Sequence, residues 1–438
     1  MRAFLFIKEL LKGERINYYL KSLEGTEKLS IKELSNLQKA KLLELLAYLK
    51  NNNSFYSRFF KDNEIDFKKA AGSNPSSILQ QLPVIDKTFI KDHYSEWVKS
   101  DLLRMSRQVT SGSTGEPFVF FSSPESSSIK IACKARFLSW HGVKRGEKQI
   151  CYLGMKLPKS LFLRAKILVN NRLIWNQSII DSTRINPKKE IERINRKKPI
   201  TIYGYPTTIY EIAQYSLSND YPILNLRLKE IILSGESHSP SIEAAVRKAF
   251  HVTPLDEYCT MEGYIAGTCE HHNLHINEDV VFAEVLNESG EISSYGKGEL
   301  LVTHLYSKEF PFVRYKTGDI VEVTDEQCQC NRPFKIIKNI DGRAGSYIYN
   351  GQMKISDAAL ATIVIPIDYI RSIIRFQIIQ NDRKSILLRI QTNNDSCHFI
   401  EYESYIRKVF DKVSVSFEYV NELAKENSGK FRVIVNNT

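Results

Sequence analysis

Residues 110–117 have the composition of a loop that binds phosphate. The eight residues read Thr-Ser-Gly-Ser-Thr-Gly-Glu-Pro, and six of them are Ser, Thr or Gly. Glycines permit the backbone angles that point several N–H groups at one anion, and hydroxyls add donors without bulk. No Gly-Lys-Ser/Thr ends the loop, so it is not a Walker A loop. Taken alone, the stretch fits a polar turn between strands equally well.

The bulk composition narrows the class of protein. The chain has 438 residues, with 42% hydrophobic and 25% charged residues, which is ordinary for a globular protein of two or three domains. No apolar run approaches the ~18 residues of a membrane helix, and the apolar part of residues 1–11 is too short for a secretory signal. We therefore expect a cytoplasmic protein without a transmembrane segment.

The net charge of +11 raises the question of an anionic partner. Its densest patch, residues 188–198, contains Ile191 and Ile194 and is interrupted by glutamates, as in a solvated helix face. No nucleic-acid-binding motif accompanies it, so we expect no nucleic-acid partner.

The chain must position the phosphate-binding loop on regular elements. Residues 1 to about 100 read as mostly helical, with leucines at helical spacing from Ile31 to Leu49. Further on, strands are predicted at 149–153, 199–203 and 228–233, and helices at 209–217 and 240–250. This alternation implies a largely parallel sheet that binds ligands at the carboxyl ends of its strands. Runs at 282–286, 299–304 and 320–323 predict a smaller β-rich subregion.

The segment 341–345, Asp-Gly-Arg-Ala-Gly, is a charged break with two glycines and a candidate hinge. Beyond it, β-rich runs at 373–379 and 385–391 and a helix at 399–409 suffice for a small domain. The sequence therefore predicts an α/β fold. A large domain, residues 1–340, has mixed sheets and a helical N-terminal segment. A hinge, 341–345, leads to a small mobile α+β lid, 346–438.

Five short motifs occur in the order found in one superfamily, the adenylate-forming acyl ligases. They are the loop 110–117, Tyr258–Glu262 (Tyr-Cys-Thr-Met-Glu), Tyr315–Asp319 (Tyr-Lys-Thr-Gly-Asp), Gly342-Arg343 and Ser428–Arg432 (Ser-Gly-Lys-Phe-Arg). They resemble the superfamily's phosphate loop, aromatic-to-glutamate motif, Thr-Gly-Asp motif, hinge and C-terminal lysine motif. Each is weak alone, but the ordered set is specific.

Within that superfamily the chain resembles the branch of phenylacetate–CoA ligases and the CapK-type proteins of capsular polysaccharide gene clusters. The segments that carry this resemblance are 82–87 (Leu-Pro-Val-Ile-Asp-Lys), 204–207 (Gly-Tyr-Pro-Thr), 233–236 (Leu-Ser-Gly-Glu) and 269–319. The Gly-Tyr-Pro segment and the Ser-Gly-Lys-Phe-Arg ending are closer to the CapK type.

The resemblance implies that a carboxylic acid attacks the α-phosphate of ATP, expels pyrophosphate and becomes an acyl-AMP. Such chemistry needs positioning and charge neutralisation. Glu262 is expected to act in catalysis by ligating Mg²⁺, which prefers oxygen ligands, and Asp319 to accept both ribose hydroxyls. Arg343 would lie near the ribose or the phosphates. Lys430 would bridge the attacking carboxylate and the α-phosphate as a mobile point charge.

The same resemblance assigns binding roles to three further segments. The residues expected to hold the phosphates are Ser111, Gly112, Ser113, Thr114 and Gly115, with Thr114 also catalytic. The other expected nucleotide contacts are Ser234, Gly235, Glu236 and Tyr258. The residues expected to line the acid pocket are Tyr203, Gly204, Tyr205 and Pro206.

Cysteine and histidine residues suggest a second site, one that binds a metal ion. Cys269, His275, Cys328 and Cys330 occupy positions where the branch tends to carry such residues, and three thiolates with one imidazole suit tetrahedral Zn²⁺. A closed four-ligand site would be structural, and His271 or His272 would be the alternatives to His275. The other cysteines considered, Cys133, Cys151 and Cys397, are interpreted as core packing.

Two positions depart from the family pattern. Cys259 replaces the usual glycine, and Met261 replaces the usual Ser/Thr before the glutamate. The expected activity is acid adenylation followed by acyl transfer to an amino or hydroxyl group in polysaccharide biosynthesis, with CoA as the alternative acceptor. Because of Cys259 and Met261, a degenerate protein that binds nucleotide without turnover is a further alternative.

Overall fold

The computed structural model describes residues 13–65, 75–98, 105–110, 118–154, 171, 176–344, 346–366, 372–392, 399–426 and 430–438. It divides the chain into two compact units. Unit 1 consists of Met1–Lys144 and Tyr258–Asn339, and unit 2 of Arg145–Glu257 and Ile340–Thr438. The unit boundaries lie after Lys144, within strand β7 and within strand β14.

Unit 1 begins with helices and continues with antiparallel strands. Its helices are α2 (Ile16–Thr26), α3 (Ile31–Asn52), α4 (Ser54–Asp62), α6 (Pro75–Leu79), α7 (Lys87–Asp92), α8 (Tyr94–Trp97) and α9 (Pro124–Trp140). Ser30 and Glu33 form a capping box that fixes the start of α3. The buried leucines of α3 and the aromatic residues of α4 join one apolar core with Phe118, Phe120 and Phe312.

The strands of unit 1 include β13, which carries the predicted Thr-Gly-Asp motif. They are β1 (Ser106–Thr110), β2 (Phe118–Ser122), β8 (Tyr264–Thr268), β9 (Leu274–Ile276), β10 (Val281–Leu286), β11 (Ile292–Ser293), β12 (Gly296–His304) and β13 (Tyr315–Thr324). β14 (Ile336–Arg343) starts in this unit, and the order is β11-β10-β12-β13-β14-β9-β8. β1 and β2 form a separate antiparallel hairpin whose last pair is Thr110 and Phe118. The hairpin therefore flanks the predicted phosphate loop, 111–117, which lies outside the described residues.

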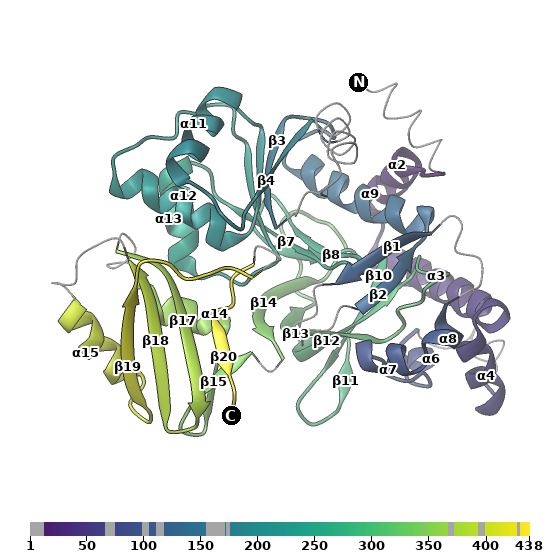
Figure 1. Cartoon of the computed structure of the whole chain (residues 1–438). Coiled ribbons are helices and arrows are strands. Elements are labelled where there is room, and N and C mark those ends of the chain that lie inside the picture. The colour runs from purple at the N-terminus through teal and green to yellow at the C-terminus, as the bar shows by residue number, and fades with distance from the viewer. Residues whose placement is uncertain are drawn as a thin grey trace. The chain divides into compact units, whose positions relative to one another are not determined.

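The first part of unit 2 is a parallel sheet with helical crossovers (Figure 1). Its strands are β3 (Gln149–Leu153), β4 (Gln177–Asp181), β5 (Thr201–Gly204), β6 (Glu230–Ser234) and β7 (Leu255–Cys259), in the order β4-β3-β5-β6-β7. The crossover helices are α11 (Pro187–Lys197), α12 (Pro206–Ser218) and α13 (Pro240–Phe250). Each begins with proline at its first position, where no N–H is needed.

The second part of unit 2 is a small α+β region. Its elements are β15 (Tyr347–Asn350), β16 (Met353–Ser356), α14 (Asp357–Val364), β17 (Ile373–Asp382), β18 (Ser385–Thr392), α15 (Phe399–Val409), β19 (Ser414–Val420) and β20 (Ile434–Asn436). The sheet order is β19-β18-β17-β20, and α15 packs beside β19 (Figure 1). Both parts of unit 2 share one apolar core, which includes Tyr210 and Ile373.

The structure confirms the predicted α/β class with a helical N-terminal part. The predicted helices 240–250 and 399–409 match α13 and α15. The basic stretch 188–198 lies in α11, with Ile191 and Ile194 buried, as expected for a solvated amphipathic helix. Among the described residues, no helix is long and apolar enough to cross a membrane. The predicted division at 341–345 stays a prediction, and Gly345 lies outside the described residues.

Candidate functional site

Two motifs far apart in the sequence are hydrogen-bonded to each other in unit 1. The hydroxyl of Tyr258, at the end of β7, donates to Asp319 Oδ2 at 2.5 Å. The hydroxyl of Tyr315, at the start of β13, donates to Glu262 Oε1 at 3.2 Å. Each motif therefore supplies a phenol to the carboxylate of the other. We call Glu262 and Asp319 the carboxylate pair.

Asp319 is held from its backbone as well as from its side chain. It is buried, and its N–H donates to Thr317 Oγ1 at 3.2 Å. The Thr317 hydroxyl in turn donates to the Leu300 carbonyl of the neighbouring strand β12 at 3.0 Å. The Thr-Gly-Asp sequence thus fixes the carboxylate to the sheet and aims it at Tyr258.

Glu262 stands on a tight turn between β7 and β8. The Thr260 N–H donates to the Gly263 carbonyl at 2.9 Å, and Lys130 Nζ of α9 donates to the Thr260 carbonyl at 2.6 Å. A Cβ at Gly263 would lie 2.2 Å from His304 Cε1, so the His304 ring can pack here only against glycine. Burial lowers the pKa of His304 to about 4, so this imidazole is neutral at pH 7.

A lysine that sequence reasoning did not assign also faces this carboxylate. Lys87 Nζ, at the start of α7, lies 3.8 Å from Glu262 Oε1. The segment before it is tied to β13, because the Lys316 N–H donates to the Ile85 carbonyl at 2.8 Å. Lys87 ends the segment 82–87, which carried part of the family resemblance. That resemblance was the one sequence feature that could have marked Lys87 as a site residue.

Unit 2 holds the predicted acid-pocket segment and the C-terminal lysine. A Cβ at Gly204 would lie 2.7 Å from the Tyr152 carbonyl oxygen, so only glycine fits where β5 meets β3. Gly235 has φ +83°, and a Cβ there would lie 3.1 Å from Tyr205 Cε1 and 3.4 Å from Lys430 Cε. Lys430 Nζ lies 6.0 Å from the centroid of the Tyr205 ring. Lys430 therefore lies beside the Gly-Tyr-Pro and Ser-Gly-Glu segments.

Two glutamates organise these segments. Glu257 Oε1 accepts from the Tyr203 hydroxyl at 2.9 Å and from Ser234 Oγ at 3.3 Å. Glu236 accepts from Thr207 Oγ1 at 2.7 Å and from the Phe431 N–H at 2.8 Å. Burial raises the pKa of Glu236, and these hydrogen bonds oppose that rise. Glu257 was not among the predicted site residues, because a single buried glutamate within a strand forms no motif. Thr207 belongs to the Gly-Tyr-Pro-Thr segment but was given no role of its own.

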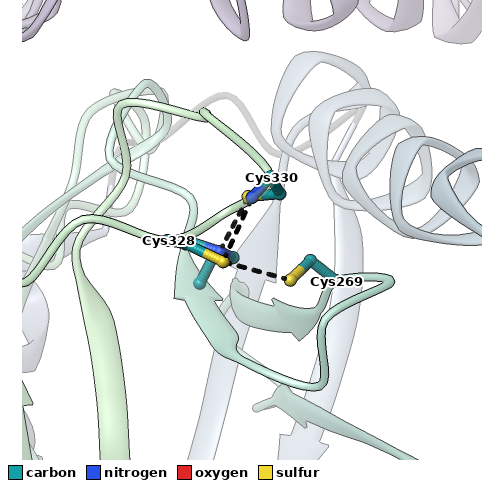
Figure 2. Close-up of side chains that lie close together, drawn as sticks. Cys269, Cys328 and Cys330 are labelled. Atoms are coloured by element: carbon teal, nitrogen blue, oxygen red, sulfur yellow. Dashed lines mark hydrogen bonds between the residues drawn. The ribbon is translucent and has the colours of Figure 1, made fainter.

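Four predicted metal ligands come together in unit 1. The ligand atoms of Cys269, His275, Cys328 and Cys330 all lie within 4.8 Å of one another. Cys269 Sγ and Cys328 Sγ are 3.7 Å apart, and Cys330 Sγ and His275 Nε2 are 3.3 Å apart. Figure 2 shows the three cysteine side chains converging. Of the candidate histidines, His275 is the buried one in this group, whereas His271 and His272 are exposed.

These distances suit a tetrahedral zinc ion. Two sulfurs bound at ~2.3 Å with tetrahedral angles lie about 3.8 Å apart, close to the spacing of Cys269 and Cys328. His275 Nδ1 lies 3.0 Å from the Phe334 carbonyl, so a proton there leaves Nε2 as a lone-pair donor toward the cysteines. Backbone and side-chain N–H groups, among them Asn273 Nδ2 at 3.2 Å, point at Cys328 Sγ. Burial raises the pKa of Cys269 to about 12, so without a cation this thiol stays protonated.

Comparison with known proteins agrees with this arrangement. A family model of the CapK C-terminal domain matches residues 347–437. Protein CapK of Staphylococcus aureus is 29% identical over 419 residues, which cover 92% of this chain and 90% of that protein. Phenylacetate-coenzyme A ligase of Thermus thermophilus is 25% identical over 328 residues, which cover 72% of each chain. The crystal structure of 2-hydroxyisobutyryl-CoA ligase in the postadenylation state has the same fold, with a TM-score of 0.77 at 15% identity over 94% of this chain and 91% of that one.

The chain is therefore similar to CapK and phenylacetate-coenzyme A ligase over most of its length, and it has the fold of an acyl-CoA ligase.

The structure describes only some of the predicted site residues. Ser111, Gly112, Ser113, Thr114 and Gly115 lie outside the described residues, as do Ser428 and Gly429 before the C-terminal lysine. Arg343 ends β14 with an exposed side chain. Pro206 is the buried first residue of α12. The two departures from the family pattern differ in exposure, because Cys259 is half-buried and Met261 is exposed.

Proposed function

We propose that this protein activates a carboxylic acid as its AMP ester and then transfers the acyl group. The observation that carries the proposal is the reciprocal hydrogen bonding of the carboxylate pair, Tyr258 to Asp319 and Tyr315 to Glu262. Two acidic side chains from separate motifs are thereby held on neighbouring segments by neutral donors. Carboxylates fixed in this way are oriented acceptors for hydroxyl groups or a metal ion of a ligand.

Each carboxylate has a distinct task in this proposal. Asp319 accepts hydrogen bonds from the two ribose hydroxyls of the nucleotide, while Tyr258 keeps it oriented. Glu262 would hold Mg²⁺, which neutralises charge on the phosphates when bound. Its near neighbour Lys87 supplies a further positive charge on this side of the site. Residues 111–115, between β1 and β2, would bind the phosphates through backbone N–H groups and hydroxyls.

Lys430 is assigned to the chemical step. Its ammonium would neutralise charge that develops between the attacking carboxylate and the α-phosphate. The acid would lie against Tyr203, Tyr205 and the backbone of Gly235. Ser234 and Glu236 flank Gly235 in the same loop. Glu236 holds both Thr207 and the backbone next to Lys430 by hydrogen bonds.

For the second step we propose an amino or hydroxyl group of a sugar as the acceptor. The resemblance to CapK-type proteins of capsular polysaccharide gene clusters supports this choice. The similarity to phenylacetate–CoA ligase supports CoA as the competing acceptor. A presynthesised acyl-adenylate offered CoA and amino sugars in separate reactions distinguishes them.

We further propose a structural zinc ion bound by Cys269, His275, Cys328 and Cys330, and a hinge at 341–345 that lets the C-terminal region move between the two half-reactions. The closed set of four ligands leaves no position for substrate, which favours a structural role over a catalytic one.

Acid-dependent exchange of pyrophosphate into ATP tests the adenylation. A panel of carboxylic acids should contain at least one that promotes exchange in the wild-type protein and not in the Asp319→Ala variant. Asp325→Ala is the matched control, because Asp325 is an exposed residue just beyond the same strand. Nucleotide binding without exchange for any acid in a broad panel would overturn the proposal and favour the non-catalytic alternative.

A further inference from the structure

A buried ion cluster fastens the segment that carries Lys430. The described residues 421–426 and 430–433 lie between β19 and β20 in the sequence, and we call them the C-terminal segment. Lys425 Nζ donates to the Ser182 carbonyl at 2.9 Å, to Thr208 Oγ1 at 2.9 Å and to Glu211 Oε2 at 3.1 Å. Its side chain is only 2% exposed. A lysine this deeply enclosed is uncommon, because the burial of an ammonium is unfavourable unless it is paired.

The acceptors of Lys425 do not belong to the small α+β region. Ser182 follows β4, and Thr208 and Glu211 lie on the first turns of α12. The same Glu211 also forms an ion pair with Arg375 of β17, whose Nη1 donates to the Leu423 carbonyl at 3.1 Å. Glu211, Arg375 and Lys425 form the ion cluster, in which one carboxylate serves two cations. It joins the small α+β region to the parallel-sheet part of the same unit.

The cluster is mechanically linked to Lys430. The N–H of Glu426, the residue after Lys425, donates to the Lys430 carbonyl at 2.9 Å. On the far side of Lys430, the Phe431 N–H donates to Glu236 at 2.8 Å. Lys430 therefore lies between two attachments, and the one before it depends on Lys425.

We propose that Lys425 is a positioning residue that sets the place of Lys430 for adenylation by anchoring the C-terminal segment to α12. Its role is distinct from that of Lys430, because its own ammonium is enclosed by protein acceptors. Burial, together with the positive charge of Arg375, lowers the pKa of Lys425 to about 7. The effect of the anchor on adenylation rests on the proposed function.

Lys425→Met tests the anchor with its shape nearly kept. Removing the ammonium leaves Glu211 paired with Arg375, so the unit should still fold. The exposed Lys408 of α15 gives the control variant Lys408→Met. Thr208→Val removes one acceptor at nearly constant volume and should produce a smaller effect in the same direction.

Amide hydrogen exchange gives a readout that does not require activity. In Lys425→Met, peptides from residues 421–433 should exchange about tenfold faster or more, while peptides from α13 stay unchanged. Pyrophosphate exchange should fall by about 10- to 100-fold with the KM for ATP unchanged, the scale for misplacing a catalytic group by about 1 Å. Transfer from a presynthesised acyl-adenylate should be kept, since Lys430 serves only the first step.

Two results would overturn the proposal. Unchanged hydrogen exchange in the C-terminal segment would show that Lys425 is no anchor, whatever the activity. Equal losses in both half-reactions would show a merely structural role. If the wild-type protein promotes no pyrophosphate exchange, the proposed function fails, and hydrogen exchange still decides whether Lys425 anchors the segment.

Discussion

The carboxylate pair and the ion cluster hold buried charges in opposite ways. Asp319 and Glu262 accept hydrogen bonds from the neutral phenols of Tyr258 and Tyr315. Glu211 instead faces two cations, Lys425 and Arg375. Phenols orient both carboxylates of the pair, and Lys87 adds one ion pair to Glu262 at 3.8 Å. In the ion cluster, by contrast, the paired charges themselves fasten separate elements to each other. The contrast separates residues that meet substrate from residues that place them.

The Cys/His cluster would be a third device, in which a metal ion replaces the protein cation. The largest expected effect follows from removing it. Replacing Cys328 and Cys330 by serine should abolish zinc binding and lower the unfolding free energy by several kcal/mol, because a structural zinc site contributes on the order of 10 kcal/mol in small peptides. Metal analysis and thermal unfolding measure both. The control Cys133→Ala removes a buried thiol outside the cluster and should keep its zinc. A wild-type protein that is purified without metal and is equally stable with a chelator would rule out the site.

Removing the shared carboxylate of the ion cluster should come next in size. Glu211→Gln removes the carboxylate that Lys425 and Arg375 share, and we expect a loss of about 3–5 kcal/mol in unfolding free energy. Lys425→Met should cost only about 1–2 kcal/mol, since Glu211 keeps Arg375. Denaturant unfolding of both variants measures the asymmetry. Equal losses would mean that the cluster does not share one carboxylate.

The Lys430→Ala variant tests the residue assigned to the chemical step. Adenylation should fall by about 100- to 1,000-fold, the scale for one transition-state charge contact. ATP affinity should hardly change, because the carboxylate pair and the phosphate loop supply the ground-state contacts. Transfer from a presynthesised acyl-adenylate should survive. Pyrophosphate exchange, nucleotide titration and single-turnover transfer measure the three quantities, and a parallel loss in all three would assign Lys430 a structural role.

Asp319→Ala should act on binding. Losing a charged acceptor for two hydroxyls costs about 1.5–3 kcal/mol, so ATP affinity should fall by roughly 10- to 150-fold or beyond detection. The fold should remain, since Tyr258 loses one partner near a ligand site. Calorimetric titration with a non-hydrolysable ATP analogue provides the measurement. Binding equal to that of Asp325→Ala would refute the ribose assignment.

The features that could be predicted from the sequence are the helices and strands with a periodic apolar pattern and the short local motifs. Helices α13 and α15 were predicted from their apolar spacing, and the parallel strands from their alternation with helices. The motif carboxylates and the cysteines could be named because their residue types demand a particular chemistry. Even so, the hydrogen bond between Tyr258 and Asp319 is seen only in the structure, because a separation of 61 residues does not predict which side chains come into contact.

The ion cluster could not be predicted in the same way. Glu211, Arg375 and Lys425 are common residue types at distant positions, and each alone is typical of a solvated surface. What makes them an anchor is the shared burial of α12, β17 and the C-terminal segment, which depends on tertiary packing. The sequence did not predict the contacts of Lys87 and Lys130 for the same reason, although Lys87 ends the segment 82–87, which carried part of the family resemblance.

The last expected effect is a pH dependence of stability that comes from Lys425 of the ion cluster. Lys425 is faced by Glu211 of α12, Arg375 of β17, Glu236 after β6 and Asp181 of β4. Burial first, and then Arg375, lowers the pKa of Lys425 to about 7, against ~10.4 for a free lysine. Below pH 7 the amine is charged in the folded and unfolded chain alike, and the cost of burying it is fully present. Between pH 7 and about 10 the folded protein binds fewer protons than the unfolded chain, so this cost is relieved as the pH rises, by at most about 1.4 kcal/mol per pH unit.

The stability of the wild-type protein relative to Lys425→Met should therefore increase from pH 6.5 to pH 9. Taking the difference between the two proteins cancels titrations that they share, including those of the carboxylate pair and the cysteines. Denaturant unfolding at both pH values measures it, with Lys408→Met as the control, for which the difference from wild type should not change with pH. A relative stability that falls as the pH rises would mean that the ammonium form is the one that the cluster favours. The charged ammonium of Lys425 would then stabilise the folded protein, and the anchor would be strongest at low pH.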